Sequence, residues 1–251
     1  AERLQAVAEL SASLAHEIRN PLASIRSATE QLARRRTRSL EPTADDDDER
    51  ILHDLVVREA DRLSRLLADF LDFARARVTR VSRIDLGALA KAASMIAASH
   101  PDRCADVQVQ VNVAPDLPPV EGDEDLLHRA VFNLVLNAVQ AVGPHGHVFI
   151  EVDRYRPAGE HGASSALVTG ELLTVSVTDD GPGVPPELKD RLFEPFVTGK
   201  IGGTGLGLPV VHRAVEAHRG VVLVDALARG TRFTMLLPIA IDTDSFRRGE
   251  T

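Results

Sequence analysis

Two long runs of apolar residues at helical spacing, separated by an acidic break, constrain the fold of this chain more than any other feature. The first run consists of Leu4, Val7, Leu14, Ile18, Leu22, Ile25 and Leu32, and it keeps a spacing of three or four when Ser11 and Ala28 or Thr29 fill its two gaps. The second follows at Leu52, Leu55, Leu63, Leu66, Phe70 and Phe73. The break at 39–48 contains Pro42 and four consecutive aspartates. This spacing is typical of amphipathic helices, so we expect a long antiparallel helical hairpin over residues 1–80.

A single hairpin of this length leaves part of its apolar surface uncovered. Two helices of roughly 30 residues are each ~45 Å long, and one pair cannot cover both apolar stripes. Packing against a second copy of the chain gives a four-helix bundle, which buries all the stripes. We therefore expect the hairpin to form a homodimer.

The chain changes its periodicity after about Val81. Apolar and polar residues alternate in five segments, which predicts strands, at 107–113, 148–153, 172–179, 221–226 and 231–237. Helical spacing returns between them, at 86–99, 123–142 and 206–218. Mixed strands and helices predict an α/β layer structure over residues 81–241. We expect residues 154–170 to form a long loop and residues 242–251 a loosely ordered tail.

Composition excludes several classes of protein. Lys and Arg number 29 and Asp and Glu 37, giving a formal net charge of −8. That balance argues against binding to nucleic acid, which needs a basic face. Cys104 is the only cysteine, so no intrachain disulfide or cysteine zinc cluster can form.

The chain offers no segment suited to lipid. Its longest stretch without a charged side chain, at 130–150, contains amides, glycines and histidines that would be left polar in a bilayer. We expect no membrane contact from this fragment. The first residues carry no signal-peptide pattern. We therefore expect a cytoplasmic fragment of a longer protein whose sensor region lies upstream.

The first candidate reactive group is His16, which begins the hexapeptide at 16–21. A neutral imidazole is nucleophilic and titrates near neutral pH. Glu17 can orient one ring nitrogen by reaching sideways, and Asn20, one turn further on, shares the face of His16. Pro21 should bend or loosen the helix just beyond them. A surface histidine beside a charged pair would explain the hexapeptide equally well.

Two asparagines four residues apart form the second candidate site. Asn133 and Asn137 project from one face of the predicted helix at 123–142, while apolar neighbours can face the core. Neutral amide oxygens can bind a hard cation such as Mg²⁺ without repelling phosphate groups. Surface or capping amides would give the same pattern.

Two glycine-rich segments complete the list of candidates. Asp179 to Gly183 directly follows a predicted strand, where glycines permit a tight turn and close approach to a ligand; an ordinary Asp-Gly turn is the alternative. The segment 202–208 precedes a predicted helix and can cradle an anion with backbone N–H groups. Lys200, just upstream, can neutralise a terminal phosphate.

Together, and in this order, these segments resemble the sensor histidine kinase family. The histidine box corresponds to 16–21, the asparagine box to 133–137 and the first glycine box to 179–183. A phenylalanine box at 193–196 and a second glycine box at 203–207 follow. The resemblance spans about residues 3–238, and the residues around Gln140 and Lys200 are similar to the nitrogen-sensor branch. Each box alone is weak, whereas five in order are specific.

The resemblance implies roles for the helical residues. His16 is the expected phosphoacceptor, Glu17 its acid/base helper, and Asn20 a residue that acts in dephosphorylation of a partner regulator. Asn137 is the expected Mg²⁺ ligand, with Asn133 assisting near the phosphates.

The resemblance also implies that residues 81–241 form a two-layer α/β sandwich, the ATPase fold shared with gyrase and the heat-shock chaperones, and that this fold holds a nucleotide pocket. Asp179 is the expected adenine-reading carboxylate, in a pocket shaped by Gly181 and Gly183. Residues 198–207 are expected to form a lid over the triphosphate, with candidate binding residues Thr198, Lys200, Gly203, Thr204, Gly205, Leu206 and Gly207.

The implied activity is ATP-dependent autophosphorylation of His16, with Mg²⁺, followed by transfer to an aspartate of a separate response regulator. Phosphatase activity toward that regulator is compatible with it. A hydrolytic ATPase and a non-catalytic dimeric nucleotide-sensing scaffold are the alternatives, and a metal site at His145 and His147 is a further idea. Arg219 and Arg229 stand where the family often has glycine, and we expect both to lie away from the nucleotide site.

Overall fold

A computed structural model describes residues 14, 18–32, 46–74, 76–100, 106–156, 171–200 and 203–239. The chain divides into two compact units. The first extends to Asp72 and includes the short segment Lys200–Thr204; the second comprises Phe73–Gly199 and the chain from Gly205 onward. His16 and Glu17 lie outside the described residues, as do Cys104, residues 157–170 of the expected loop and the tail at 242–251.

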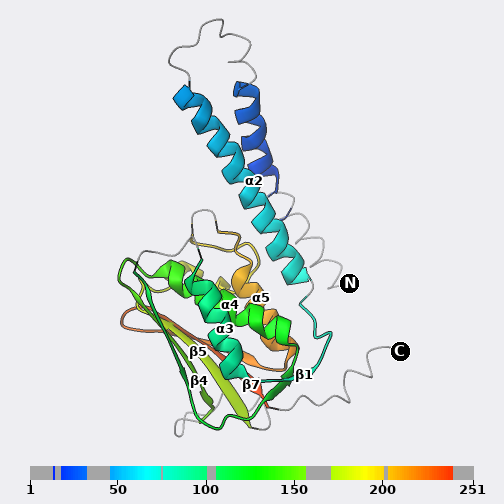
Figure 1. Ribbon diagram of the computed structural model, residues 1–251, viewed down its shortest axis with the longest axis vertical. Helices are drawn as coiled ribbons and strands as arrows, with labels where there is room; N and C mark the ends of the chain where they lie inside the picture. The colour runs from blue at the N-terminus through cyan, green and yellow to red at the C-terminus, as the bar shows by residue number, and fades with distance from the viewer. Residues whose placement is uncertain are drawn as a thin grey trace, which may run out of the picture. The chain divides into compact units, whose positions relative to one another are not determined.

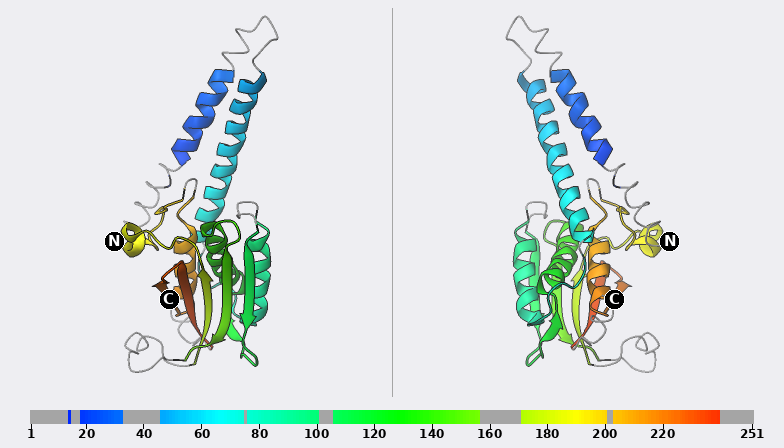
Figure 2. Two further views of the ribbon diagram at one scale, coloured as in Figure 1. Left: turned by 90° about the vertical axis from the view of Figure 1, so that its left-hand side faces the viewer. Right: turned by 90° about the vertical axis from the view of Figure 1, so that its right-hand side faces the viewer.

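The first unit is the helical hairpin that the apolar spacing predicts. Residues 18–32 are helical, without interruption at Pro21, and α2 spans Asp46–Ala74. The two helices run side by side in opposite directions (Figures 1 and 2). Ala28 and Leu66 are buried along them. The prediction of a hairpin is therefore confirmed.

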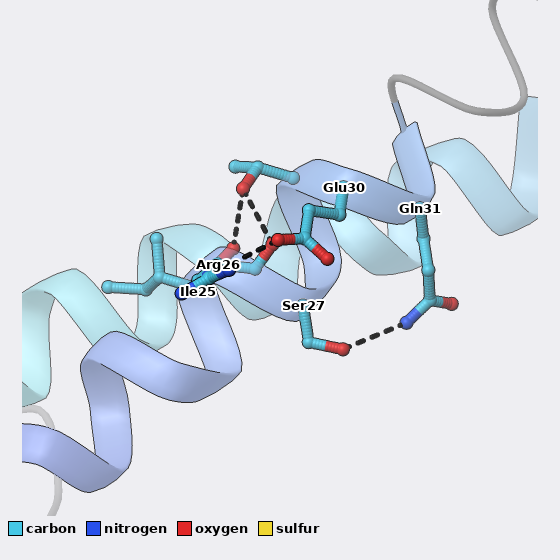
Figure 3. A network of polar contacts seen from close by, with 6 residues as sticks. Ile25, Arg26, Ser27, Glu30 and Gln31 are labelled. Carbon is cyan, nitrogen blue, oxygen red and sulfur yellow. Dashed lines mark hydrogen bonds and ion pairs between the residues drawn. The ribbon is translucent and has the colours of Figure 1, made fainter.

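Polar side chains on the exposed side of helix 18–32 form contacts within the helix (Figure 3). Arg26 Nε donates to Glu30 Oε1 at 2.8 Å, and Thr29 Oγ1 donates to the carbonyl of Ile25 at 2.9 Å. Exposed contacts of this kind stabilise a helix only slightly. The helix therefore depends mainly on burial of its apolar face.

The second unit is built on a five-stranded mixed sheet. Its strand order is β2-β4-β5-β7-β6, with β2 parallel to β4 and all other neighbours antiparallel. The strands are β2 (Gln108–Val113), β4 (His147–Arg154), β5 (Leu172–Asp179), β6 (Val221–Ala226) and β7 (Thr231–Pro238). A separate two-stranded sheet pairs β1 (Ser82–Ile84) with β3 (Val120–Gly122).

Three helices pack on one face of the five-stranded sheet (Figures 1 and 2). They are α3 (Leu86–Ala98), α4 (Glu124–Ala141) and α5 (Gly207–Ala217). Val148, Ile150 and Val152 of β4 are buried, while Phe149 and Glu151 between them are exposed. This alternation places the aliphatic core between the helices and the sheet, so the two-layer α/β sandwich is confirmed.

The three-residue strands and a short 3₁₀ helix were not predicted from the sequence. β1 and β3 are too short to show a period of two, and the 3₁₀ helix η2 spans Pro186–Arg191 within a segment rich in proline and charge. None of the helices in the described ranges combines the length and apolar character needed to cross a membrane.

A buried histidine connects the start of α4 to the end of α5 through hydrogen bonds. The His218 ring is fully buried, its Nε2 accepts from Asp123 N at 2.9 Å, and its Nδ1 contacts the Ala214 carbonyl at 2.7 Å. Burial lowers the pKa of His218, so the ring is neutral with Nδ1 protonated. Asp123 in turn caps α4 by accepting from Leu126 N. The hydrogen-bonded pair of Asp123 and His218 thus fixes the position of α4 in the core.

Replacing Gly122 by alanine is expected to destabilise the second unit by roughly 1–3 kcal/mol. A Cβ at this position would lie 2.7 Å from Cδ2 of His218 and 2.8 Å from its Nε2. The ring cannot retreat, because both of its nitrogens are engaged. Denaturant unfolding would measure the loss. Gly143→Ala is the control, since its Cβ would meet nothing within 4 Å; equal stability of the two variants would contradict the prediction.

Candidate active site

Residues 18–21 of the histidine box are described, and the candidate residue among them, Asn20, is exposed. It lies in helix 18–32, where the side chain of Pro21 is buried. The roles expected for His16 and Glu17 concern residues outside the described ranges. Asn20 is therefore placed on an accessible helix surface of the first unit.

The two asparagines lie where the periodicity predicts, in the middle of α4. Both are partly buried, while Leu134, Val135 and Ala138 of the same helix are buried in the core. A Cβ at Gly207, the first residue of α5, would lie 3.3 Å from Asn133 Oδ1 and 3.7 Å from Asn137 Nδ2. The amide face of α4 is thus directly against the beginning of α5.

The beginning of α5 supplies backbone donors beside these amides. Its N-cap residue, Leu206, makes no side-chain capping hydrogen bond. The first N–H groups of a helix have no partner within the helix and carry partial positive charge. Asn133, Asn137 and the start of α5 therefore form a polar surface that suits an anion accompanied by a cation.

The Asp179 turn lies against the C-terminal end of α4. Asp179 ends β5, is 6% exposed, and accepts a hydrogen bond from Gly181 N at 2.9 Å through Oδ1. A Cβ at Gly181 would lie 2.9 Å from the carbonyl oxygen of Ala141, the last residue of α4. Gly183 has a φ of +82°, a conformation that favours glycine. α4 therefore links the Asp179 turn to the asparagines.

The segment expected to form a lid contains one tightly packed glycine turn. Gly205 has a φ of +66°, its carbonyl accepts from Phe196 N at 3.0 Å, and a Cβ there would lie 2.5 Å from Phe196 C. This contact joins the phenylalanine box to the second glycine box. Thr198 is exposed in the second unit, whereas Lys200, Gly203 and Thr204 group with the first.

The structure offers no support for a metal site at His145 and His147. Within the described ranges, no group of three or more His, Cys, Asp or Glu residues could hold a metal ion. His147 Nδ1 instead lies 3.2 Å from Asp180 Oδ2, and His145 Nδ1 lies 3.9 Å from Asp106 Oδ2.

Arg229 lies next to the candidate Asp179 turn, whereas the sequence analysis placed it away from the nucleotide site. Arg229 Nε donates to the backbone carbonyl of Asp180 at 2.8 Å, directly beside Asp179. No local pattern predicts this contact, because the two residues are 49 positions apart in the chain. Arg219 has a φ of +57°, which explains why glycine suits that position.

Family models match both units of the chain. The model described as "His Kinase A (phospho-acceptor) domain" matches residues 6–78. The model described as "Histidine kinase-, DNA gyrase B-, and HSP90-like ATPase" matches residues 122–241. The second match contains Asn133, Asn137 and Asp179, the residues that the structure places along α4 and at the end of β5.

Named relatives are similar over nearly the whole chain. The sensor histidine kinase ZraS of Escherichia coli is 34% identical over 241 residues, which are 96% of this chain and 47% of that protein. The sensory histidine kinase/phosphatase NtrB of Azospirillum brasilense is 32% identical over 240 residues, or 94% and 56%. The chain thus spans about half the length of these relatives.

A solved structure of histidine kinase ThkA, in complex with response regulator protein TrrA, has a similar fold. Its TM-score is 0.68 at 24% identity, over 95% of this chain and 64% of that one. With an acceptor module and an ATPase module in family order, and with relatives of one kind along almost its full length, the chain belongs to the sensor histidine kinases of two-component systems.

Proposed function

We propose that the chain binds Mg²⁺·ATP in its second unit and transfers the γ-phosphoryl group to His16. The observation that carries this proposal is the convergence of Asn133, Asn137 and the uncapped start of α5. Side-chain amides beside a helix N-terminus suit a polyphosphate and its cation together. A non-catalytic scaffold is not favoured, because the chain carries an acceptor module as well.

In this proposal, Asp179 reads the exocyclic amine of adenine. Its carboxylate lies at the end of a buried strand and is nearly inaccessible from bulk solvent. Gly181 and Gly183 shape the turn around it. The lid that we assign over the triphosphate consists of Thr198, Lys200, Gly203, Thr204, Gly205, Leu206 and Gly207.

Asn137 is the protein ligand that we assign to Mg²⁺, with Asn133 beside it. Mg²⁺ commonly takes one or two protein oxygens together with phosphate oxygens and water, so this donor set fits. When bound, the ion neutralises phosphate charge. The neutral amides hold the nucleotide without adding repulsion, and the start of α5 contributes partial positive charge.

The reaction requires a neutral nitrogen of His16 in line with the γ-phosphorus. The new N–P bond forms as the bond from phosphorus to the β,γ-bridging oxygen breaks, and ADP leaves. Glu17 stabilises the positive charge that develops on the ring through its second nitrogen. Phosphohistidine then donates to an aspartate of a response regulator on a separate chain.

Asn20 lies on the exposed helix surface where such a regulator would dock. We assign it a role in hydrolysis of the regulator's acyl phosphate, and the relative NtrB carries the name kinase/phosphatase. We place the reaction in the cytoplasm, where ATP is supplied. We assign residues 1–80 to dimerisation and phosphotransfer, 81–241 to nucleotide binding and 242–251 to a tail.

The hairpin carries apolar side chains that a second copy would cover. Val57, Leu67 and Leu71 of α2 are 45%, 50% and 38% exposed, and their spacing of ten and four residues places them on one side of the helix. Apolar area of this kind is costly to leave in water. It supports a homodimer in which four helices form one bundle.

Introducing Glu at both Leu67 and Leu71 is expected to convert the dimer to a monomer at micromolar concentration. Two carboxylates facing each other across a bundle would be buried without partners, at a cost of several kcal/mol. Sedimentation velocity measures the change. Arg58→Glu, on the opposite side of α2, should remain dimeric; a dimeric double variant would refute the assignment of this face.

The proposed function is tested by incubating the chain with γ-labelled ATP and Mg²⁺ and mapping the modified residue. The expected product is a base-stable, acid-labile phosphoramidate on His16. Free phosphate without labelled protein would indicate a hydrolytic ATPase instead. Nucleotide binding with neither product would indicate a sensing scaffold.

A further inference from the structure

The carbonyl of Asp179 is enclosed by backbone from a distant turn. A Cβ at Gly230 would lie 1.8 Å from Asp179 O and 3.0 Å from Asp180 Cα. Gly230 has a φ of +84° and belongs to the turn between β6 and β7, where Leu227 N donates to its carbonyl at 3.2 Å. The main chain at Asp179 is therefore confined on this side by a residue without a side chain.

Asp180 is bound to the first residue of β4 by three contacts. Its Oδ1 accepts from His147 N at 2.9 Å, its Oδ2 lies 3.2 Å from His147 Nδ1, and its own N donates to His147 O at 3.2 Å. The β4–β5 ladder ends with Val148 opposite Asp179. The Asp180–His147 pair thus extends the ladder by one residue and fixes its register at Asp179.

Arg229 holds Asp180 from the opposite direction. Arg229 belongs to the β6–β7 turn, and its Nε donates to the Asp180 carbonyl at a distance of 2.8 Å. The His147 ring lies parallel to that of Phe149, with centroids 6.2 Å apart. The hydrogen bond from His147 N lowers the pKa of the Asp180 carboxyl. Asp180 is therefore ionised at neutral pH and held by two separate strand ends.

We propose that Asp180, held by His147 and Arg229, is a positioning residue that fixes the Asp179 carboxylate for recognition of the adenine amine. This inference rests on the proposed function, in which Asp179 reads that amine. A hydrogen bond between a carboxylate and an amine weakens steeply as its distance and angle depart from their optima. A turn restrained on both sides keeps the carboxylate in place before the nucleotide arrives.

The test compares two ligands: ATP and purine riboside triphosphate, which lacks only the exocyclic amine. Calorimetry on the full chain gives both dissociation constants, and their ratio measures amine recognition. We expect wild type to prefer ATP by about 10- to 100-fold, the effect of one hydrogen bond to a charged group. Asp179→Ala should bring the ratio close to one.

Asp180→Ala should lower the ratio at least about fivefold by weakening the binding of ATP alone. Asp180→Asn keeps an acceptor for His147 N and should therefore retain most of the wild-type ratio. Arg229→Ala, at an exposed side chain whose loss does not threaten folding, should lower the ratio in the same direction. Asp153→Ala, near the other end of β4, is the matched control and should keep the wild-type ratio.

The outcomes distinguish the role of Asp179 in amine recognition from the positioning role of Asp180. A wild-type ratio of one overturns the role of Asp179 and the positioning role with it. A wild-type preference that Asp179→Ala loses, but Asp180→Ala and Arg229→Ala keep, overturns the positioning role alone. Equal weakening of both ligands by Asp180→Ala would assign the residue to general stability and would also overturn it.

Discussion

Replacing His16 by glutamine is expected to abolish ATP-dependent autophosphorylation while leaving nucleotide affinity unchanged. Glutamine keeps a polar side chain of moderate size but has no nucleophilic nitrogen, since its amide lone pair is delocalised. The proposed nucleotide site is built from α4, α5 and the end of β5, in the other unit of the chain. Removing the acceptor side chain therefore abolishes phosphoryl transfer and leaves ATP binding intact.

The measurement is incorporation of labelled phosphate at saturating ATP, beside a separate binding titration. His53→Gln is the matched control, because His53 is an exposed histidine of α2 in the same unit. It should label like wild type. Persistent labelling of the His16 variant would mean that another side chain accepts the phosphoryl group, whereas loss of ATP binding would mean that the substitution disturbs more than the acceptor.

Much of the second unit follows from periodicity in the sequence. The predicted strands at 172–179 and 221–226 match β5 and β6 at both ends. In β5, buried and half-buried positions alternate over most of the strand, which is the pattern that a one-sided core produces. The predicted helix at 123–142 exceeds α4 by one residue at each end, because Asp123 caps the helix from outside it and Val142 has already turned to extended backbone.

The candidate site divides into a part that local sequence reveals and a part that it does not. The spacing of Asn133 and Asn137 is enough to predict that they share a helix face. The glycines between Asp179 and Gly183 likewise predict a turn. The closeness of Gly207 to Asn133 is a contact between two helices about 70 positions apart along the chain, and no local pattern encodes it.

Residues that support the site were missed for the same reason. Arg229 contacts Asp180, and Gly230 lies against Asp179, only because β7 pairs with β5 in the sheet. Strand order is a tertiary property, and a single sequence does not state it. A non-local partner of a turn is therefore found only when the sheet is known.

Replacing Asn137 by aspartate is expected to weaken binding of Mg²⁺·ATP by about 100-fold. In the proposed site, the added negative charge would face the triphosphate at a separation of about 5 Å, which costs roughly 3 kcal/mol at the effective dielectric constant of a protein surface. The start of α5 cannot compensate, since its partial positive charge is already directed at the same phosphates. Titration calorimetry at several Mg²⁺ concentrations measures the loss.

Asn112→Asp provides the matched control, because it makes the same chemical change on the exposed edge strand β2. It alters net charge equally but should leave affinity within about twofold of wild type, since distant surface charges are screened by salt. Equal weakening by both variants would indicate a general effect of charge. Unchanged affinity of the Asn137 variant would remove that residue from the metal and phosphate site, and would shift the binding role in α4 to Asn133.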